Sequence, residues 1–407
     1  MWSKNKNSSK NPRVFFTPCG CHNWNLILGD AASSCVQAER MFGIIQNLYT
    51  LFSISSKRWS ILIKHVNITL KPLSDTRWEC RVESVKAVKY QLEEICDALN
   101  EVHDISVGDA KIRCEAESYS ELISSYTFLV QVCVWYYILV KVNSISKLWQ
   151  KDDMQLNQAV IHLDTFMSWI DFRNTGFESA IISANETAEK MDIPKEFTTC
   201  RCCKKKRMFS YEHEDEPLAD PKELFKIKFF LVVVDMVISS MRSRFQAFKE
   251  YAGSYGFLYN ILKLQNLNKE ELVKKCNNLH LLLSDKNSYN IDDLELSEEL
   301  DMLSRIFSTN ATVTTVLKIL IEKDLQDLYP NCFIVLRIIL TIPVSVASAE
   351  RSFSRLKLIN SYLRSTMGQE RLSALAVLSV ENDVSNELDY STLINEFSNQ
   401  KCRKVLL

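Results

Sequence analysis

The chain has 407 residues, and its hydrophobic content of 46% is high enough to exclude a disordered protein and to supply a substantial core. Lysine and arginine number 49 against 50 for aspartate and glutamate, so the near-zero net charge excludes binding of nucleic acid by bulk attraction. Glycine and proline number eight each, which favours long helices over a turn-rich β architecture. We therefore predict a mainly α-helical fold.

The cysteines and the apolar stretches bear on the cellular compartment. Thirteen cysteines are scattered from Cys19 to Cys402 without paired spacing, and the first residues lack the apolar run of a secretory signal. A reduced, intracellular protein is predicted. The longest apolar stretches, 128–140 and 229–238, fall short of the roughly 20 residues that span a bilayer. We expect both to be buried helices, without membrane contact.

The N-terminal part is predicted to begin with a polar, disordered leader at residues 1–12. Residues Val14–Pro18 then predict a short buried strand that a proline ends. Apolar residues at spacings of three and four predict helix from Trp24 to about Val66. A cap-like cluster at 74–78 separates this segment from a charged helix at 82–102.

Helical patterns continue through the rest of the chain, interrupted by polar segments. Further helices are predicted at 115–147, 153–173, 177–191, 221–251 and within a last block at 312–382. A charged surface loop is expected near 194–222, and a turn at 283–295.

Four ordered strings near the C-terminus carry most of the information about function. They are Leu325–Pro330, Ile342–Ser354, Leu363–Met367 and Glu370–Ser373. Together they resemble the C-terminal dimerisation region of hAT-superfamily transposases, and the chain resembles transposase-derived proteins of the zinc-finger-MYM-like type. The resemblance implies a ribonuclease-H-like core that is interrupted by a long helical insertion and closed by C-terminal helices.

The apolar residues of these strings are candidates for self-association. Ser345 or Ser348 is expected to cap a helix with one apolar stripe. This helix and the next supply the candidate dimerisation residues Phe353, Leu356, Leu372, Leu375 and Leu378. The resemblance implies a homodimer or a complex with a related hAT-like protein, and burial within the monomer is the alternative.

Glu350 is the candidate catalytic residue. An acid in the first turn of a helix is favoured by the helix dipole, so a purely structural role is the simplest interpretation. The resemblance implies instead that Glu350 is the last of three acids that hold two Mg²⁺ ions. Two-metal chemistry needs several converging carboxylates, and the other two family acids precede the segment at which this chain begins. We therefore expect a remnant of a catalytic site, no bound cofactor and no enzymatic activity.

The string Cys19-Gly20-Cys21-His22 is similar to a Cys-x-x-His turn of the same family. A structural zinc site needs four nitrogen or sulfur ligands, and no second pair at a suitable spacing is apparent. We expect Cys19 and His22 to be structural, as a hydrogen-bonded histidine beside small buried thiols, and we expect no metal.

Arg77 and Trp78 are the candidate DNA-binding residues. They belong to an Asp-Thr-Arg-Trp string that resembles a family motif in which the tryptophan stacks on an unpaired base. The alternative is a tryptophan that anchors the core or an interface.

A basic run is the candidate nuclear signal, and it consists of Lys204, Lys205, Lys206 and Arg207. A nuclear address or a phosphate contact is one interpretation, and the nucleus is the favoured compartment. A solvated loop, balanced by acids at 212–216, is the alternative.

These patterns predict a mainly α fold with an incomplete ribonuclease-H-like core that retains one short strand. The expected domains are a leader at 1–12, a partial core at 13–72, a helical insertion at 73–311, a dimerisation region at 312–385 and a tail at 386–407. The predicted function is that of a catalytically incomplete, transposase-derived protein that dimerises and retains some DNA binding, without a small-molecule substrate. The alternative is the C-terminal portion of a DNA-cutting transposase whose N-terminal acids are missing from the sequence.

Overall fold

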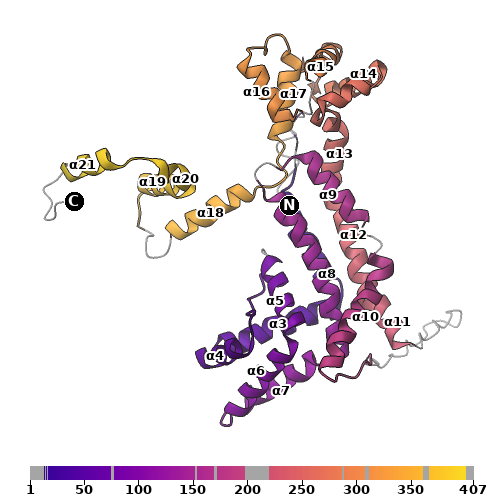
Figure 1. Cartoon of the computed structure of the whole chain (residues 1–407), viewed down its shortest axis with the longest axis vertical. Helices are drawn as coiled ribbons and strands as arrows, with labels where there is room; N and C mark the ends of the chain where they lie inside the picture. Colours follow the sequence, from indigo (N-terminus) through magenta and orange to yellow (C-terminus); the bar gives the residue numbers. More distant parts are fainter. Residues whose placement is uncertain are drawn as a thin grey trace. The chain divides into compact units, whose positions relative to one another are not determined.

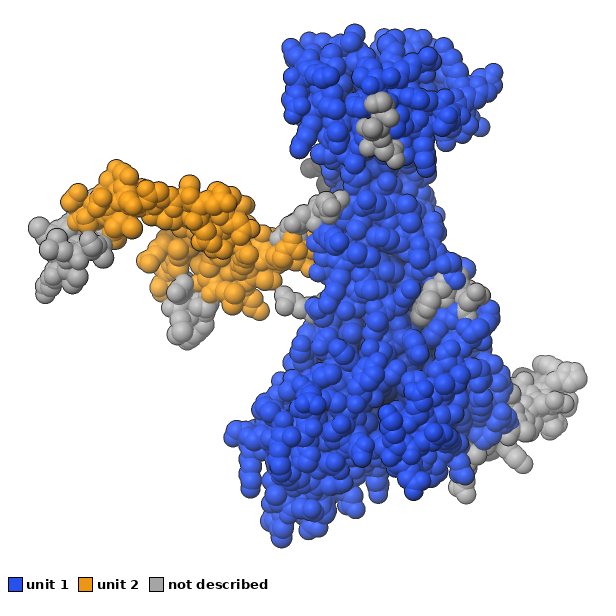
Figure 2. Space-filling view, in the orientation of Figure 1, with its two compact units in different colours: residues 1–345 blue, residues 346–407 orange. Residues whose placement is uncertain are grey.

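The fold is mainly helical, as predicted, and it is divided into two compact units. The computed structural model describes residues 13, 15, 17–74, 78–151, 154–168, 172–197, 220–286, 288–307, 311–360 and 366–399. Unit 1 comprises Met1–Ser345 and unit 2 comprises Val346–Leu407 (Figure 2). The boundary lies inside the predicted dimerisation region, 312–385, so this region is shared between the two units.

The N-terminal part of unit 1 is a succession of helices. They are α2 (Gly20–Ala32), α3 (Val36–Ser53), α4 (Ser56–His65), α5 (Trp78–Tyr90), α6 (Leu92–Ile105) and α7 (Ala110–Ile123) (Figure 1). The predicted helix at 82–102 is broken at Gln91, whose φ of −136° is not helical. The side-chain oxygen of Gln91 accepts hydrogen bonds from the backbone N–H groups of Asn67 and Ile68, at 2.6 and 2.9 Å. A contact with a distant segment thus decides where the helix breaks.

The middle of unit 1 continues with longer helices. They are α8 (Tyr126–Trp149), α9 (Leu156–Ser168), α10 (Phe172–Lys190), α11 (Pro221–Phe225), the π-helix η2 (Lys226–Leu231), α12 (Val232–Arg244) and α13 (Gln246–Tyr255). The helix α8 packs against α2, α3, α5, α7 and α10. By length and composition α8 could cross a membrane, but 67% of its most apolar 18 residues are buried inside the protein, as in a core helix. The absence of membrane contact stays a prediction.

Unit 1 ends in shorter elements around a small hairpin. They are the 3₁₀ helices η3 (Gly256–Tyr259) and η4 (Ile261–Asn266), α14 (Lys269–Leu282), β1 (Ser284–Asp285), β2 (Ser288–Tyr289), α15 (Asp293–Ile306), α16 (Val313–Glu322) and α17 (Pro330–Thr341). The strands β1 and β2 pair antiparallel, with Ser284 opposite Tyr289. Unit 2 contains α18 (Ala347–Ile359), α19 (Gln369–Val380), α20 (Asn382–Glu387) and α21 (Ser391–Asn399).

The strand predicted at 14–18 is not formed at Phe15, Thr17 or Pro18, which are in neither a strand nor a helix, and Val14 and Phe16 lie outside the described residues. The sheet of the described residues consists of β1 and β2. A strand needs a neighbour to pair its backbone groups. The ring of Phe15 packs instead edge-on against Tyr251, with centroids 5.2 Å apart. The ribonuclease-H-like core remains a prediction.

An aromatic cluster joins the start of unit 1 to helices much later in the chain. The ring centroid of Trp24 lies 4.9 Å from Phe245 and 5.9 Å from Trp149. Gly20 begins α2 beside this cluster, and its N–H donates to the carbonyl oxygen of Val344 at 2.8 Å. A Cβ at Gly20 would lie 2.5 Å from the Trp149 ring, so this close approach requires glycine.

A buried carboxylate fixes the start of α17. Glu299 of α15 is 8% exposed, and its Oε2 accepts a hydrogen bond from the backbone N–H of Cys332 at 2.7 Å. Its Oε1 accepts from the backbone N–H of Asn331 and from the Asn331 side chain, at 3.2 and 2.7 Å. The first N–H groups of a helix have no partner within the helix. Glu299 supplies that partner and its charge is favourable at this helix end.

Replacement of Glu299 by alanine is therefore expected to destabilise unit 1. The N–H groups of Asn331 and Cys332 would remain buried without acceptors, which costs about 2–4 kcal/mol. Urea denaturation should show this loss for Glu299→Ala, whereas Glu298→Ala, at the neighbouring exposed position, should change the free energy of unfolding by less than about 0.5 kcal/mol. Equal effects of the two substitutions would contradict the capping role.

Candidate functional site

The helices α18 and α19 of unit 2 form a clasped pair. They pack against each other, and Arg355 of α18 reaches the end of α19. Its Nη1 donates to the carbonyl oxygens of Ser379 and Val380, the latter at 2.9 Å. The last carbonyls of a helix lack partners within the helix and carry the negative end of its dipole, so a guanidinium group is favourable there. This interaction gives unit 2 a defined local geometry.

The apolar side chains of unit 2 are largely uncovered. Of the predicted dimerisation residues, Phe353 is 69% exposed and Leu378 is 48% exposed. Leu356, Leu372 and Leu375 are half-buried, and we assign their partial burial to the packing of α18 on α19. Further apolar residues of unit 2 are more than one-third exposed, namely Val346, Leu358, Val377, Val384, Leu388, Tyr390, Leu393, Ile394 and Phe397.

None of the described residues at 366–399 is buried. Exposed apolar surface of this extent on one small unit is typical of an interaction surface.

Glu350 lies in the first turn of α18, with its side chain exposed. Its backbone N–H donates to the carbonyl oxygen of Val346 at 3.0 Å. Among the described residues, no group of three or more His, Cys, Asp or Glu side chains is arranged to hold a metal ion. A pair of Mg²⁺ ions needs several carboxylates, so this part of the chain does not fit such a pair, and no catalytic step can be derived from it.

The cysteine and histidine side chains at the start of α2 point in different directions. Cys21 is buried, and its Sγ lies 3.8 Å from the carbonyl oxygen of Ser146. The contact with Cys19, together with burial, raises the pKa of the Cys21 thiol far above its usual value, so this thiol is neutral and unreactive. His22 is exposed, because successive helix residues differ by about 100° in direction. The ring of His22 therefore does not lie among buried thiols, contrary to the prediction from the sequence.

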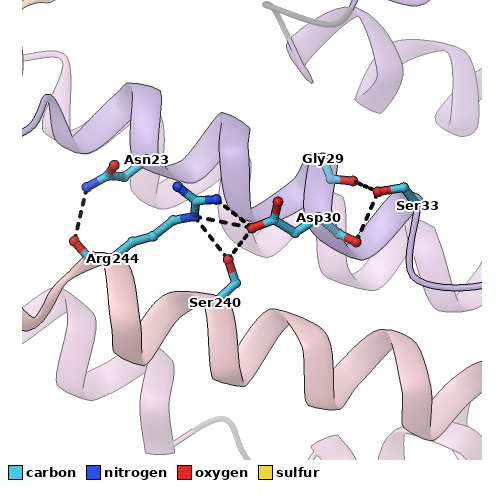
Figure 3. A network of polar contacts seen from close by, with 6 residues as sticks. All are labelled: Asn23, Gly29, Asp30, Ser33, Ser240 and Arg244. Atoms are coloured by element: carbon cyan, nitrogen blue, oxygen red, sulfur yellow. Dashed lines mark hydrogen bonds and ion pairs between the residues drawn. The ribbon is translucent and has the colours of Figure 1, made fainter. Parts of the chain in front are cut away.

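A polar network ties α2 to α12 (Figure 3). Oδ2 of Asp30 accepts hydrogen bonds from Nη2 of Arg244 at 2.7 Å and from Oγ of Ser240 at 2.5 Å. Nδ2 of Asn23 donates to the carbonyl oxygen of Arg244 at 3.2 Å. Burial opposes ionisation of Asp30, but the contacts with Ser240 and Arg244 prevail and lower its pKa. Asp30 is therefore an ion-pair partner between two helices rather than a free helix-surface acid.

Trp78 lies inside unit 1, with 4% of its surface exposed. Its ring contacts Phe42 edge-on at a centroid distance of 5.8 Å. The Cζ atom of Arg81 lies over the same ring, 4.1 Å from the ring centroid. A nucleobase could stack on this face only after displacing Arg81. The packing agrees with the alternative of a core anchor, and the DNA role of Trp78 stays a prediction. Arg77 lies outside the described residues, as do Lys204, Lys205, Lys206 and Arg207 of the basic run.

A comparison with protein families identifies a known region near the C-terminus of the chain. Residues 301–384 match the hAT family C-terminal dimerisation region. The similarity to the hAT family is to this region of the chain. No solved structure matches it. This hAT region, residues 301–384, extends from the end of α15 through α17 in unit 1 and then through α18 and α19 into α20 in unit 2. Its described function points to self-association.

Three residues that form long-range contacts carry little signal in the sequence. Each of them contacts a helix that is remote along the chain, and they are Glu299, Arg244 and Arg355. The partner of Arg244 is Asp30, which is 214 residues away in the sequence. Charge and spacing do not identify such pairs. The one available signal is at Arg355, which belongs to the Ser-Phe-Ser-Arg-Leu string of the hAT region.

The Asp30–Arg244 pair predicts a pH-dependent contribution to stability. The pKa of Asp30 is lowered on folding, so its ionised form stabilises the folded state at neutral pH. This stabilisation is lost as the pH falls below the usual aspartate pKa of about 4. Asp30→Asn should lower the free energy of unfolding at pH 7 by about 1 kcal/mol, since the pair is partly screened by solvent.

Denaturation curves between pH 7 and about 3 should show the difference between Asp30→Asn and the wild type shrinking with acid. Asp97→Asn, at an exposed position, serves as the control. A difference that does not depend on pH would contradict an ionic role for Asp30.

Proposed function

We propose that the chain is a transposase-derived protein that works by self-association through its hAT region and that does not itself cut DNA. The observation that carries the proposal is the exposed apolar surface of unit 2, which lies partly within the hAT region. Helices without a buried side gain little stability on their own, because isolated helices shorter than about 12–15 residues are marginal in water. A second copy supplies the missing burial, and its identical sequence makes a symmetric contact possible.

The absence of cleavage is the second part of the proposal. It is supported by the exposed position of Glu350 and by the lack, among the described residues, of three or more His, Cys, Asp or Glu side chains arranged to hold a metal ion. We propose that no Mg²⁺ is held by these residues. The wider assignment to the zinc-finger-MYM-like type, the ribonuclease-H-like ancestry of the core, residual DNA binding and a nuclear location belong to the same proposal. They rest on the sequence resemblance.

Light scattering on the eluted full chain should give the mass of a dimer at micromolar concentration. Leu378→Asp places a charge on the exposed apolar side of α19 and should weaken the dimer by at least about tenfold. Ser373→Asp, at an exposed position on another side of α19, should leave the dimer unchanged. A monomeric wild type would contradict the proposed self-association.

The full chain with Mg²⁺ or Mn²⁺ should leave a DNA substrate intact, because several carboxylates must converge for two-metal cleavage. The measurement is gel analysis of the DNA after incubation. Cleavage that disappears in Glu350→Gln would show instead that Glu350 is catalytic and that the protein is an active nuclease.

A further inference from the structure

The helices α5 and α8 lie side by side in unit 1 (Figure 1). Near one end of the pair, Nζ of Lys147 in α8 lies 2.9 Å from Oε1 of Glu79 in α5. Near the other end, Lys89 of α5 contacts Tyr136 of α8, so the two helices run antiparallel. Their shared surface, which we call the α5–α8 face, consists of Lys86, Lys89 and Tyr90 of α5 and of Tyr137, Val140, Lys141 and Leu148 of α8.

The ammonium group of Lys89 lies among three tyrosine rings. Its Nζ is 4.5 Å from the ring centroid of Tyr136, 5.1 Å from that of Tyr137 and 5.5 Å from that of Tyr90. A cation over an aromatic ring is attracted by the negative face of the ring. Burial and the hydrogen bond with Tyr90 raise the pKa of Tyr136 to about 12. This phenol therefore stays neutral and does not cancel the charge of Lys89.

The lysines of the α5–α8 face have no acidic partner among the described residues. Lys86, Lys89 and Lys141 are all half-buried, and none of them forms an ion pair with a described carboxylate. The helix α8 contains no acidic residue. Of the acids of α5, Glu79 is engaged with Lys147, and Glu83 remains. The face therefore carries an excess of positive charge, although the net charge of the whole chain is −1.

One side of α8 is uncovered beside these lysines. Tyr137 is 39% exposed, Val140 is 40% exposed and Leu148 is 37% exposed. At about 100° per residue, these positions and Lys141 share one side of the helix. The strip from Tyr137 to Leu148 extends over about 16 Å, at a rise of about 1.5 Å per residue. Spacings of three and four residues are those of a ridge that packs into the groove of another helix.

The rings and charges of the α5–α8 face favour an acidic helix over a nucleic acid as the ligand. A nucleobase needs an open aromatic face on which to stack, whereas the ammonium of Lys89 already lies over the rings of Tyr136 and Tyr137. Three lysines neutralise few phosphates, and the net charge of the chain adds no attraction. Single glutamate or aspartate side chains can pair with these lysines, while apolar side chains of the same helix cover the strip on α8.

We propose that the α5–α8 face binds an acidic amphipathic helix of another protein. Acidic side chains of that helix pair with Lys86, Lys89 and Lys141, and its apolar side packs on Tyr137 and Val140. The face lies in unit 1 and outside the hAT region, so the proposal goes beyond self-association and does not depend on it.

The test titrates the full chain with two synthetic amphipathic peptides of about 20 residues, long enough to form a helix. Both carry leucine on one side, and the other side carries glutamate in one peptide and lysine in the other. Calorimetry should show that the wild type binds the glutamate peptide and not the lysine peptide. Lys86→Glu combined with Lys141→Glu should raise the dissociation constant of the glutamate peptide by at least about tenfold. Val140→Asp, in the apolar strip, should weaken binding similarly.

The control combines Lys263→Glu with Lys274→Glu, at exposed positions outside α5 and α8. It makes the same change in net charge and should alter the dissociation constant by less than about twofold. Circular dichroism establishes that the variants keep their helices. No binding of the glutamate peptide to the wild type would overturn the proposal, as would equal binding to the Lys86→Glu/Lys141→Glu variant.

Two further measurements test other occupants of the α5–α8 face. The wild type should bind a single-stranded oligonucleotide more weakly than the glutamate peptide. Tighter binding of the oligonucleotide that is lost in the Lys86→Glu/Lys141→Glu variant would show a nucleic-acid surface and overturn the proposal. Sedimentation equilibrium should give the same self-association for this variant and the wild type. Weaker self-association of the variant would mean that a second copy of the chain covers the face, and it would also overturn the proposed partner.

Discussion

The burial of apolar side chains around α8 is the interaction on which unit 1 depends. α8 contacts helices on both sides of it in the sequence, and Trp149 at its end joins the aromatic cluster that holds Trp24 and Phe245. Residues that are far apart in the chain thus share one core. Polar contacts act on this framework locally, as Glu299 does at the start of α17 and Arg244 does between α12 and α2. The described residues of unit 1 consequently share a hydrophobic core of their own.

Unit 2 differs from unit 1, because its helices have a defined local geometry but almost none of their described side chains is buried. The hydrogen bonds of Arg355 to the end of α19 define a helix pair, but a hydrogen bond to a charged group contributes only about 1.5–3 kcal/mol net. Full burial of one leucine or phenylalanine side chain contributes a similar amount, about 1.5–3 kcal/mol, and several such side chains are exposed here. Association of two copies is the simplest way to recover that free energy. It also gives a physical reason for the match of this region to a dimerisation region.

The sequence was informative where a structural feature is local. Helices α7 to α10 and α16 to α19 lie close to the predicted segments, since the spacing of apolar residues reports directly on a helix with one buried side. The break at Gln91 and the Asp30–Arg244 pair were not predictable, because their partners are remote along the chain. The strand predicted at Phe15 is not formed, for a related reason. A short apolar run that ends in a proline forms a strand only where a neighbouring strand can pair with it. For the site, the sequence identified Phe353 and Leu378 as apolar, but their exposure became evident only from the structure.

Stabilisation of unit 2 by a second copy of the chain should make the protection of its helices depend on protein concentration. The measurement is hydrogen–deuterium exchange of the full chain at several protein concentrations, from below to above the dimer dissociation constant. We expect amides in α18, α19 and α21 to exchange more slowly as the concentration rises, while those in α8 stay equally protected throughout. Exchange in α18, α19 and α21 that is the same at every concentration would contradict it.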